Sequence, residues 1–207
     1  MPRCVAGAVG ATPTEVVFTS GGTEADNLAL VGIFEARRSA DAQLDVVAIS
    51  ALEHPAIAET AAWLAKERGA EILVLPTLPT GVVDLDAALE AMEAVKDRLA
   101  IVSVMWANNE LGTIQPVLEL AAACREWGVP MHSDTVQAAG YLPIDFGQTQ
   151  LAAVSLSGHK LGGPQGVGAL IIRRDVQCRP IGYGGGQERH LRSGTIPAGV
   201  ISAFGAG

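Results

Sequence analysis

Short apolar runs alternate along the chain with longer segments in which apolar residues recur every three or four positions. Runs of four to six apolar residues are typical of buried strands, and the longer period is typical of amphipathic helices. The expected strands are 16–19, 46–49, 71–75, 101–105, 129–133, 151–156 and 169–172. The expected helices are 23–38, 55–68, 84–96 with Asp84 as N-cap, and 117–127. This alternation predicts an α/β domain with a mostly parallel sheet.

Composition narrows the class of protein. The 207 residues are 49% hydrophobic and 17% charged, which allows a substantial core, and the net charge is −8. An acidic chain of this kind is not expected to bind nucleic acid or an anionic membrane surface. Since no apolar run approaches about 20 residues and the first residues carry no secretory-signal pattern, we expect a cytoplasmic protein.

The cysteines do not form a recognisable framework. Cys4, Cys124 and Cys178 are far apart, odd in number and without a CxxC pair. A disulfide network or a metal site is therefore not expected. Cys124 shares a helical face with Val117 and Leu120 and is predicted to be a small core residue.

Lys160 stands just after an apolar strand and just before a turn rich in glycine and proline. We expect this junction to desolvate the lysine, which favours a neutral amine able to attack a carbonyl carbon. Ser157 and His159 stand close enough in sequence to present hydrogen-bonding groups beside it. The alternative is an ordinary solvated lysine at a strand end.

Five further polar clusters stand out, and the first four follow expected strands, where ligands bind in open α/β sheets. Ser20–Thr23 is a glycine turn before a helix and suits a phosphate, although Thr23 is equally suited to cap that helix. It is neither a Walker A loop nor a GxGxxG fingerprint. Asp134 suits a cationic ring nitrogen, with Gln137 near a ring substituent, or else it caps a following helix.

The remaining clusters also have two interpretations. Asn108 and Asn109 suit either a turn or hydrogen bonding to a ring oxygen. His54 suits either a helix cap or contact with a planar ligand. Gly184–Arg189 and Arg192–Thr195 suit either an anion or a flexible loop.

Together these motifs resemble those of the cysteine desulfurases, which are class V aminotransferase-fold enzymes that use pyridoxal 5′-phosphate (PLP). The resemblance runs in order over nearly the whole chain. It rests on the segments 19–27, 53–54, 108–110, 134–137, 157–160 and 192–195. It implies a three-layer αβα domain of PLP fold type I, with residues 1–207 forming the large, PLP-binding domain.

The resemblance also implies roles for individual residues. Lys160 would hold PLP as a Schiff base, and His54 would stack on the ring and assist proton transfer. The implied phosphate ligands are Gly22, Thr23, Ser157 and His159, with Thr195 reaching the cofactor of a neighbouring subunit in a homodimer. The implied ring ligands are Asp134 at the pyridinium nitrogen and Gln137 with Asn109 at the ring oxygen.

The implied reaction converts L-cysteine to L-alanine and leaves the sulfur as an enzyme persulfide for an acceptor such as an iron–sulfur scaffold protein. In this family the catalytic cysteine and the arginine that binds the substrate carboxylate lie in the small C-terminal domain. We expect that domain, and the N-terminal segment of the family, to lie outside residues 1–207. Gln165 stands where many relatives have lysine.

Three alternatives stay open at this point. A selenocysteine lyase or another class V enzyme would share the cofactor motifs. A non-catalytic PLP-binding remnant would bind cofactor without turnover. A nucleotide-binding Rossmann domain is disfavoured because its fingerprint is missing.

Overall fold

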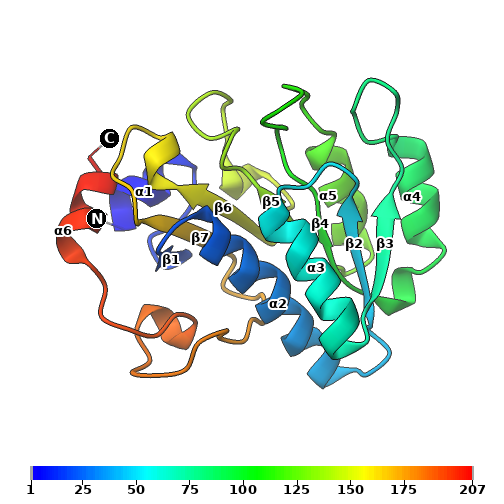
Figure 1. The fold of residues 1–207 in the computed structure, drawn as a ribbon, viewed down its shortest axis with the longest axis horizontal. Coiled ribbons are helices and arrows are strands. Elements are labelled where there is room, and N and C mark those ends of the chain that lie inside the picture. Colours follow the sequence, from blue (N-terminus) through cyan, green and yellow to red (C-terminus); the bar gives the residue numbers. More distant parts are fainter. Residues whose placement is uncertain (1, 207) are drawn as a thin grey trace.

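The computed structural model describes residues 2–206 and is built around a seven-stranded sheet (Figure 1). The strand order is β1-β7-β6-β5-β4-β2-β3. Strands β2 to β6 form parallel pairs where they adjoin, and β7 is antiparallel to both of its neighbours. The strands are β1 (Val16–Thr19), β2 (Val46–Ser50), β3 (Glu71–Leu75), β4 (Leu99–Ser103), β5 (Met131–Asp134), β6 (Ala153–Ser157) and β7 (Gly168–Ile172).

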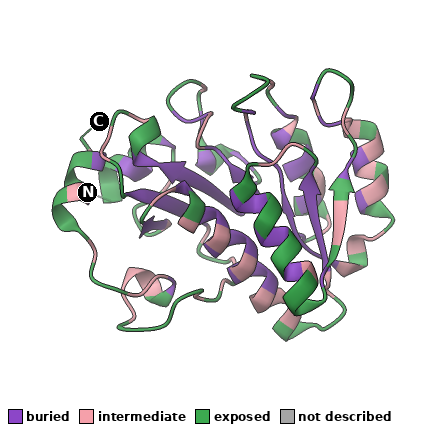
Figure 2. Cartoon of the chain, in the orientation of Figure 1, coloured by how far each residue is buried: buried purple, intermediate pink, exposed green. Residues whose placement is uncertain are grey.

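Helices cover both faces of this sheet. The helices are α1 (Pro2–Ala8), α2 (Gly22–Ala40), α3 (Pro55–Arg68), α4 (Leu85–Glu93), α5 (Val117–Glu126) and α6 (Ala198–Phe204). One apolar core packs α2 and α3 against the sheet, and a second packs α1, α4, α5 and α6 against the other face. Figure 2 shows buried residues concentrated in the sheet between them. The predicted three-layer αβα fold with a mostly parallel sheet is confirmed.

Helix α3 has the bounds that the sequence predicts because its end signals are local. His54 Nδ1 accepts the N–H of Ala56 at 3.1 Å, and Pro55 occupies the first helical position. Gly69 ends the helix with a left-handed φ of 64°. The Asp84 cap of α4 is also confirmed, since Asp84 Oδ1 accepts the N–H of Ala87. That helix ends at Glu93, earlier than expected.

Several strand bounds were predicted two residues away from their true position. β4 ends at Ser103 rather than 105, β5 begins at Met131 rather than 129, and β6 spans 153–157 rather than 151–156. A run of apolar residues shows which residues are buried, whereas hydrogen bonding to the neighbouring strands determines where a strand begins and ends. Pro130 has no backbone N–H to donate, and β5 begins directly after it. Helices α1 and α6 are seven residues each, too short to show a period, and were not predicted.

The cysteines behave as small side chains of the fold. Cys124 is fully buried in the core between α5 and the sheet, as predicted. All three cysteines are free thiols. Among the described residues, none of the helices combines the length and apolar character that a bilayer crossing requires.

Candidate active site

A cavity of about 280 Å³ lies at the carboxyl ends of the parallel strands. Nine of the ten residues expected to bind cofactor line it, although they come from five separate stretches of sequence. The nine are Gly22, Thr23, His54, Asn109, Asp134, Gln137, Ser157, His159 and Lys160. Asp26, Met105 and Val136 complete the wall. The fold therefore collects the motifs that were separate in the sequence.

A second cavity, of about 350 Å³, lies at the start of α2 and shares four of these residues, Gly22, Thr23, Ser157 and His159. No side chain caps the first turn of α2, which decides against Thr23 as an N-cap. The free N–H groups and the positive end of the helix dipole suit an anion. A Cβ on Gly22 would meet Val136 Cγ2 at 2.8 Å, so glycine keeps this wall open.

Ser157, the last residue of β6, and His159, in the turn that follows, also line the second cavity. Ser157 Oγ lies 3.0 Å from His159 Nδ1, which fixes the imidazole relative to the strand. Ser157 pairs with Gly168 of β7 in the sheet. A Cβ on Gly168 would lie 2.6 Å from the carbonyl carbon of Gly21. The absence of a side chain there lets the start of α2 approach β6 and β7.

Asp134 is the last residue of β5 and is buried. Its Oδ1 accepts the N–H of Val136 at 2.8 Å, which closes a turn; it does not cap a helix, since no helix starts here in the described chain. Burial raises the pKa of Asp134, and the Val136 N–H and nearby His54 offset only part of that effect. A carboxylate in this state gains from a cationic partner.

His54, Asn108 and Asn109 differ in whether they stabilise the local fold or border the cavity. His54 caps α3 through Nδ1 and is exposed, and it also borders the 280 Å³ cavity. Asn108 is buried in its turn: its Oδ1 accepts the N–H groups of Glu110 and Leu111, and its Nδ2 donates to Leu52. Asn109 is exposed and borders the cavity.

Lys160 corrects one expectation. The sequence predicted a desolvated lysine, but Lys160 is exposed. It ends the 3₁₀ turn η3 (Gly158–Lys160), which leaves the sheet after β6, and it borders the 280 Å³ cavity. It also borders a neighbouring cavity of about 470 Å³, together with Cys4.

Three buried or partly buried titratable residues received no role from the sequence. Asp26 is 1% exposed on α2, and its Oδ1 lies 3.7 Å from Nε2 of His132, which is fully buried in β5. Glu53 accepts hydrogen bonds from the Ser50 hydroxyl and, at 2.8 Å, from the Met105 N–H. Burial raises the pKa of Glu53 to about 8. A charged residue on the apolar face of a predicted helix was the signal for Asp26.

Thr195 lines neither cavity in this chain and is exposed. The segment before it is anchored to α2, because Arg192 Nε donates to Glu24 Oε1 at 2.9 Å. Glu188, Arg189 and His190 have left-handed φ values of 46°, 63° and 62°. Three consecutive non-glycine residues in this region define a tight, strained turn.

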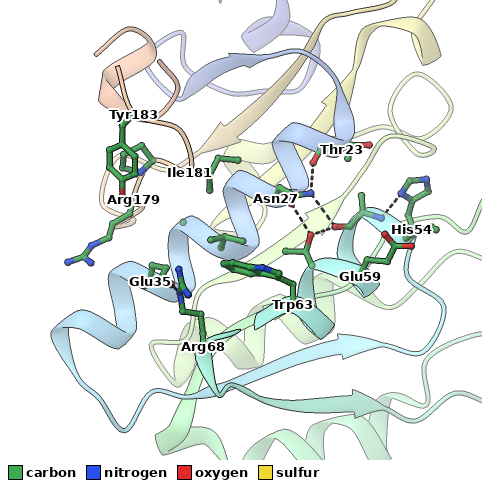
Figure 3. Close-up of a pocket in the computed structure, with 16 residues that line it drawn as sticks. Thr23, Asn27, Glu35, His54, Glu59, Trp63, Arg68, Arg179, Ile181 and Tyr183 are labelled. Atoms are coloured by element: carbon green, nitrogen blue, oxygen red, sulfur yellow. Dashed lines mark hydrogen bonds and ion pairs between the residues drawn. The ribbon is translucent and has the colours of Figure 1, made fainter. Parts of the chain in front are cut away.

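A larger groove, of about 1030 Å³, lies between α2, α3 and the 179–183 segment (Figure 3). Thr23 and His54 border both this groove and the 280 Å³ cavity, so the two are adjacent. Trp63, Ile181 and Tyr183 line the groove and are partly or largely exposed. Its walls lack Lys160 and the buried acids Asp26 and Asp134, all of which line the 280 Å³ cavity. The 280 Å³ cavity is therefore the candidate active site.

Comparison with known proteins defines the class. The aminotransferase class-V family model matches residues 3–207, so the chain belongs to that family. The IscS-like cysteine desulfurase of Mycobacterium tuberculosis is 51% identical over 201 residues, which is 97% of this chain and 50% of that protein. The cysteine desulfurases are thus the relatives within the family that this chain resembles.

Solved structures agree with this placement. DndA from Streptomyces lividans superposes with a TM-score of 0.89 at 39% identity, covering 99% of this chain and 57% of that one. SspA in complex with cysteine gives a TM-score of 0.88 at 32% identity, covering 99% and 58%. The chain spans about half the length of the curated relatives that it matches.

Proposed function

We propose that this chain is the PLP-binding large domain of a cysteine desulfurase. The observation that carries the proposal is the 280 Å³ cavity in which nine of ten expected cofactor ligands meet. A lysine, a buried aspartate and an uncapped helix start are the three groups that an aldehyde, a ring nitrogen and a phosphate require. All three border connected cavities.

The electrostatics of the cavity fit this cofactor. Asp26 and Asp134 are buried, and both have raised pKa values, mainly because of burial. Asp134 would hold the protonated pyridine nitrogen of the cofactor, whose positive charge the buried carboxylate lacks as a partner. The start of α2, with glycine at position 22, supplies N–H donors for the phosphate on the other side.

Each side chain then has a task. The Lys160 amine would anchor the cofactor aldehyde, and the Asp134 carboxylate would accept the hydrogen bond of the ring N–H. Gln137 and Asn109 donate to the ring oxygen. The phosphate contacts come from Gly22, Thr23, Ser157 and His159. The bound cofactor supplies an electron sink for a negative charge that develops on the α-carbon of the substrate.

The α3 cap determines which ring nitrogen of neutral His54 carries the proton. Its Nδ1 accepts the Ala56 N–H at 3.1 Å, so in the neutral ring Nε2 carries the proton. His54 is therefore placed to donate a hydrogen bond from Nε2–H, and it can take up a proton only at Nδ1, once the α3 cap opens. Stacking over the ring face would bring Nε2 near the substrate.

L-cysteine is the proposed substrate, with alanine as product and sulfur passed to an acceptor protein. The resemblance to a protein solved with cysteine supports this choice. Cys124 and Cys178 do not line the 280 Å³ cavity. Burial raises the pKa of each of these thiols to about 12. We propose that none of the three cysteines is the nucleophile that takes the sulfur.

We also propose a cytoplasmic homodimer. Thr195 is exposed beyond the Arg192 anchor, where it can reach a neighbouring subunit, and exposed Trp63 and Tyr183 line the adjacent groove. Sedimentation of the protein should give a dimer that Trp63→Glu together with Tyr183→Glu dissociates. A monomer in the unmodified protein would contradict this part of the proposal.

The decisive experiment is spectroscopic. Purified protein with added PLP should show a visible band that borohydride abolishes, with the reduced cofactor mapped to the Lys160 peptide. The sequence contains three lysines, Lys66, Lys96 and Lys160, so the assignment is unambiguous. Lys160→Ala should lose the label and Lys96→Ala should keep it. Failure of a folded protein to bind PLP would overturn the proposal.

A further inference from the structure

A buried polar network lies directly beneath the candidate active site. His132 Nδ1 lies 2.9 Å from Ser103 Oγ, and His132 Nε2 lies 2.9 Å from Ser155 Oγ. These contacts join β4, β5 and β6 through one fully buried imidazole. Asp26 approaches the network from α2, with Oδ1 3.7 Å from His132 Nε2. Within residues 2–206, this Asp26 oxygen has no hydrogen-bond partner.

Asp26 also faces Asp134 across the cavity floor. One oxygen of each carboxyl group and one ring nitrogen of His54 all lie within 4.8 Å of one another. Two buried carboxylates at this separation repel strongly, so one of them binds a proton. Asp134 accepts the Val136 N–H and faces His54, both of which favour its charged form. A hydrogen bond with Ser155 favours the charged form of Asp26, but burial and the nearby acids Asp134 and Glu53 oppose it.

His132 cannot balance a charge on Asp26. Burial lowers the pKa of His132 to about 3, so the ring is neutral. Burial, and then the charge of Asp134, raise the pKa of Asp26 well above its ordinary value. The local charges and the geometry thus agree on which carboxyl group binds the proton.

We propose that Asp26 is a protonated positioning residue, which leaves Asp134 as the single ionised carboxylate facing the ring nitrogen of the cofactor. This inference rests on the proposed PLP function. A second negative charge at the floor would compete with Asp134 for the ring N–H and change its geometry. A neutral Asp26 can instead donate a hydrogen bond to Ser155, its side-chain partner, and so hold the floor in place.

The other titratable groups around Asp26 are compatible with this assignment. Glu53 precedes α3. Because burial raises its pKa to about 8, Glu53 is mostly protonated at neutral pH and adds little negative charge. Nearby His54 favours the charged form of Asp134. The titratable residues facing or bordering this floor are Glu53, His54, His132, Asp134, His159 and Lys160.

The first test uses cofactor-free protein labelled with ¹³C-aspartate. Infrared difference spectroscopy at neutral pH should show the carbonyl band of a protonated aspartic acid, and Asp26→Asn should remove it. Asp134→Asn should keep the band but move its loss to lower pH, because the repelling charge is gone. A band that persists in Asp26→Asn, or no protonated aspartate at all, would overturn the inference. This test needs no cofactor.

The second test measures PLP affinity by titration of the visible band. Asp26→Asn keeps a neutral donor and should bind PLP within about threefold of the unmodified protein. Asp26→Ala loses the hydrogen bond and should bind roughly tenfold more weakly. Asp134→Asn is the matched control and should bind at least as weakly.

Asp26→Asn as weak as Asp134→Asn would mean that both carboxylates are ionised, and the inference would be wrong. Asp26→Ala equal to the unmodified protein would exclude a positioning role. Circular dichroism of each variant separates these outcomes from misfolding. If no variant, including the unmodified protein, binds PLP, the proposed function fails, while the infrared result still decides the protonation of Asp26.

Discussion

Arg192 Nε donates to Glu24 Oε1 at 2.9 Å and so ties the segment before Thr195 to the first turn of α2. The two residues are 168 positions apart, and their side chains are 21% and 23% exposed. This ion pair connects the start of α2, which lines the 350 Å³ cavity, to the strained loop that contains Glu188–His190. The loop and the candidate phosphate site are therefore structurally coupled.

Removing this ion pair should cost about 1 kcal/mol at pH 7 in a double-mutant cycle of Glu24→Gln and Arg192→Ala. Burial alone would raise the pKa of Glu24, but Arg192 and Ser20 outweigh it and hold that pKa below the ordinary 4.5. The stabilisation is thus present above pH 4.5 and is lost as the pH falls through the folded-state pKa. Denaturant unfolding checks both points, and a coupling energy independent of pH would contradict them.

Glu53 should make the cofactor-free protein less stable as the pH rises. Its pKa is about 8 in the folded state against an ordinary 4.5, so the folded protein binds the extra proton between these values. Relative to Glu53→Gln, the free energy of unfolding should fall by on the order of 4 kcal/mol from pH 4.5 to 8. Gln keeps an acceptor for Ser50 and Met105. Parallel stability curves would disprove the shift.

Gly22→Ala should weaken PLP binding by about tenfold or more. The added Cβ would lie 2.8 Å from Val136 Cγ2 and 3.5 Å from Ser157 Cβ, and overpacking of this kind costs about 1–3 kcal/mol. Gly199→Ala in α6 is the matched control, since nothing lies within 4 Å of its Cβ position. That variant should gain up to about 1 kcal/mol of stability and bind PLP normally. Spectroscopic titration and thermal unfolding distinguish the two.

Asn108 and Asn109 should give opposite phenotypes although they are neighbours. Asn108→Ala removes the partner of the Glu110 and Leu111 N–H groups and of the Leu52 carbonyl, three part-buried hydrogen bonds, and should lower stability by about 1–3 kcal/mol. Asn109→Ala should leave stability unchanged and reduce PLP affinity. Equal loss of stability in both variants would show that Asn109 is also structural.

Thiol labelling should separate the cysteines. Cys4 is exposed and should react within the native protein, whereas Cys124 and Cys178 have pKa values of about 12 through burial and should react only on unfolding. Cys4→Ser should abolish native labelling and leave PLP loading intact. Rapid native labelling of two thiols would contradict this assignment, as would loss of PLP loading in Cys4→Ser.

The sequence by itself determined the local structure and the chemical inventory. Helix α3 begins and ends as predicted because His54, Pro55 and Gly69 provide the end signals. The apolar runs located every strand of the sheet, and pairing with neighbours then shifted some strand ends. Nine of the ten expected ligands border the 280 Å³ cavity because the carboxyl ends of parallel strands meet at one edge.

Only the tertiary structure decided how these groups affect one another. Asp26 and Asp134 are 108 positions apart, and their proximity arises from the packing of α2 onto β5. Whether Lys160 is desolvated depends on the path of the η3 turn, which local sequence does not specify. Charge repulsion and burial act through space, so the protonation of the cavity floor follows from the fold rather than from any motif.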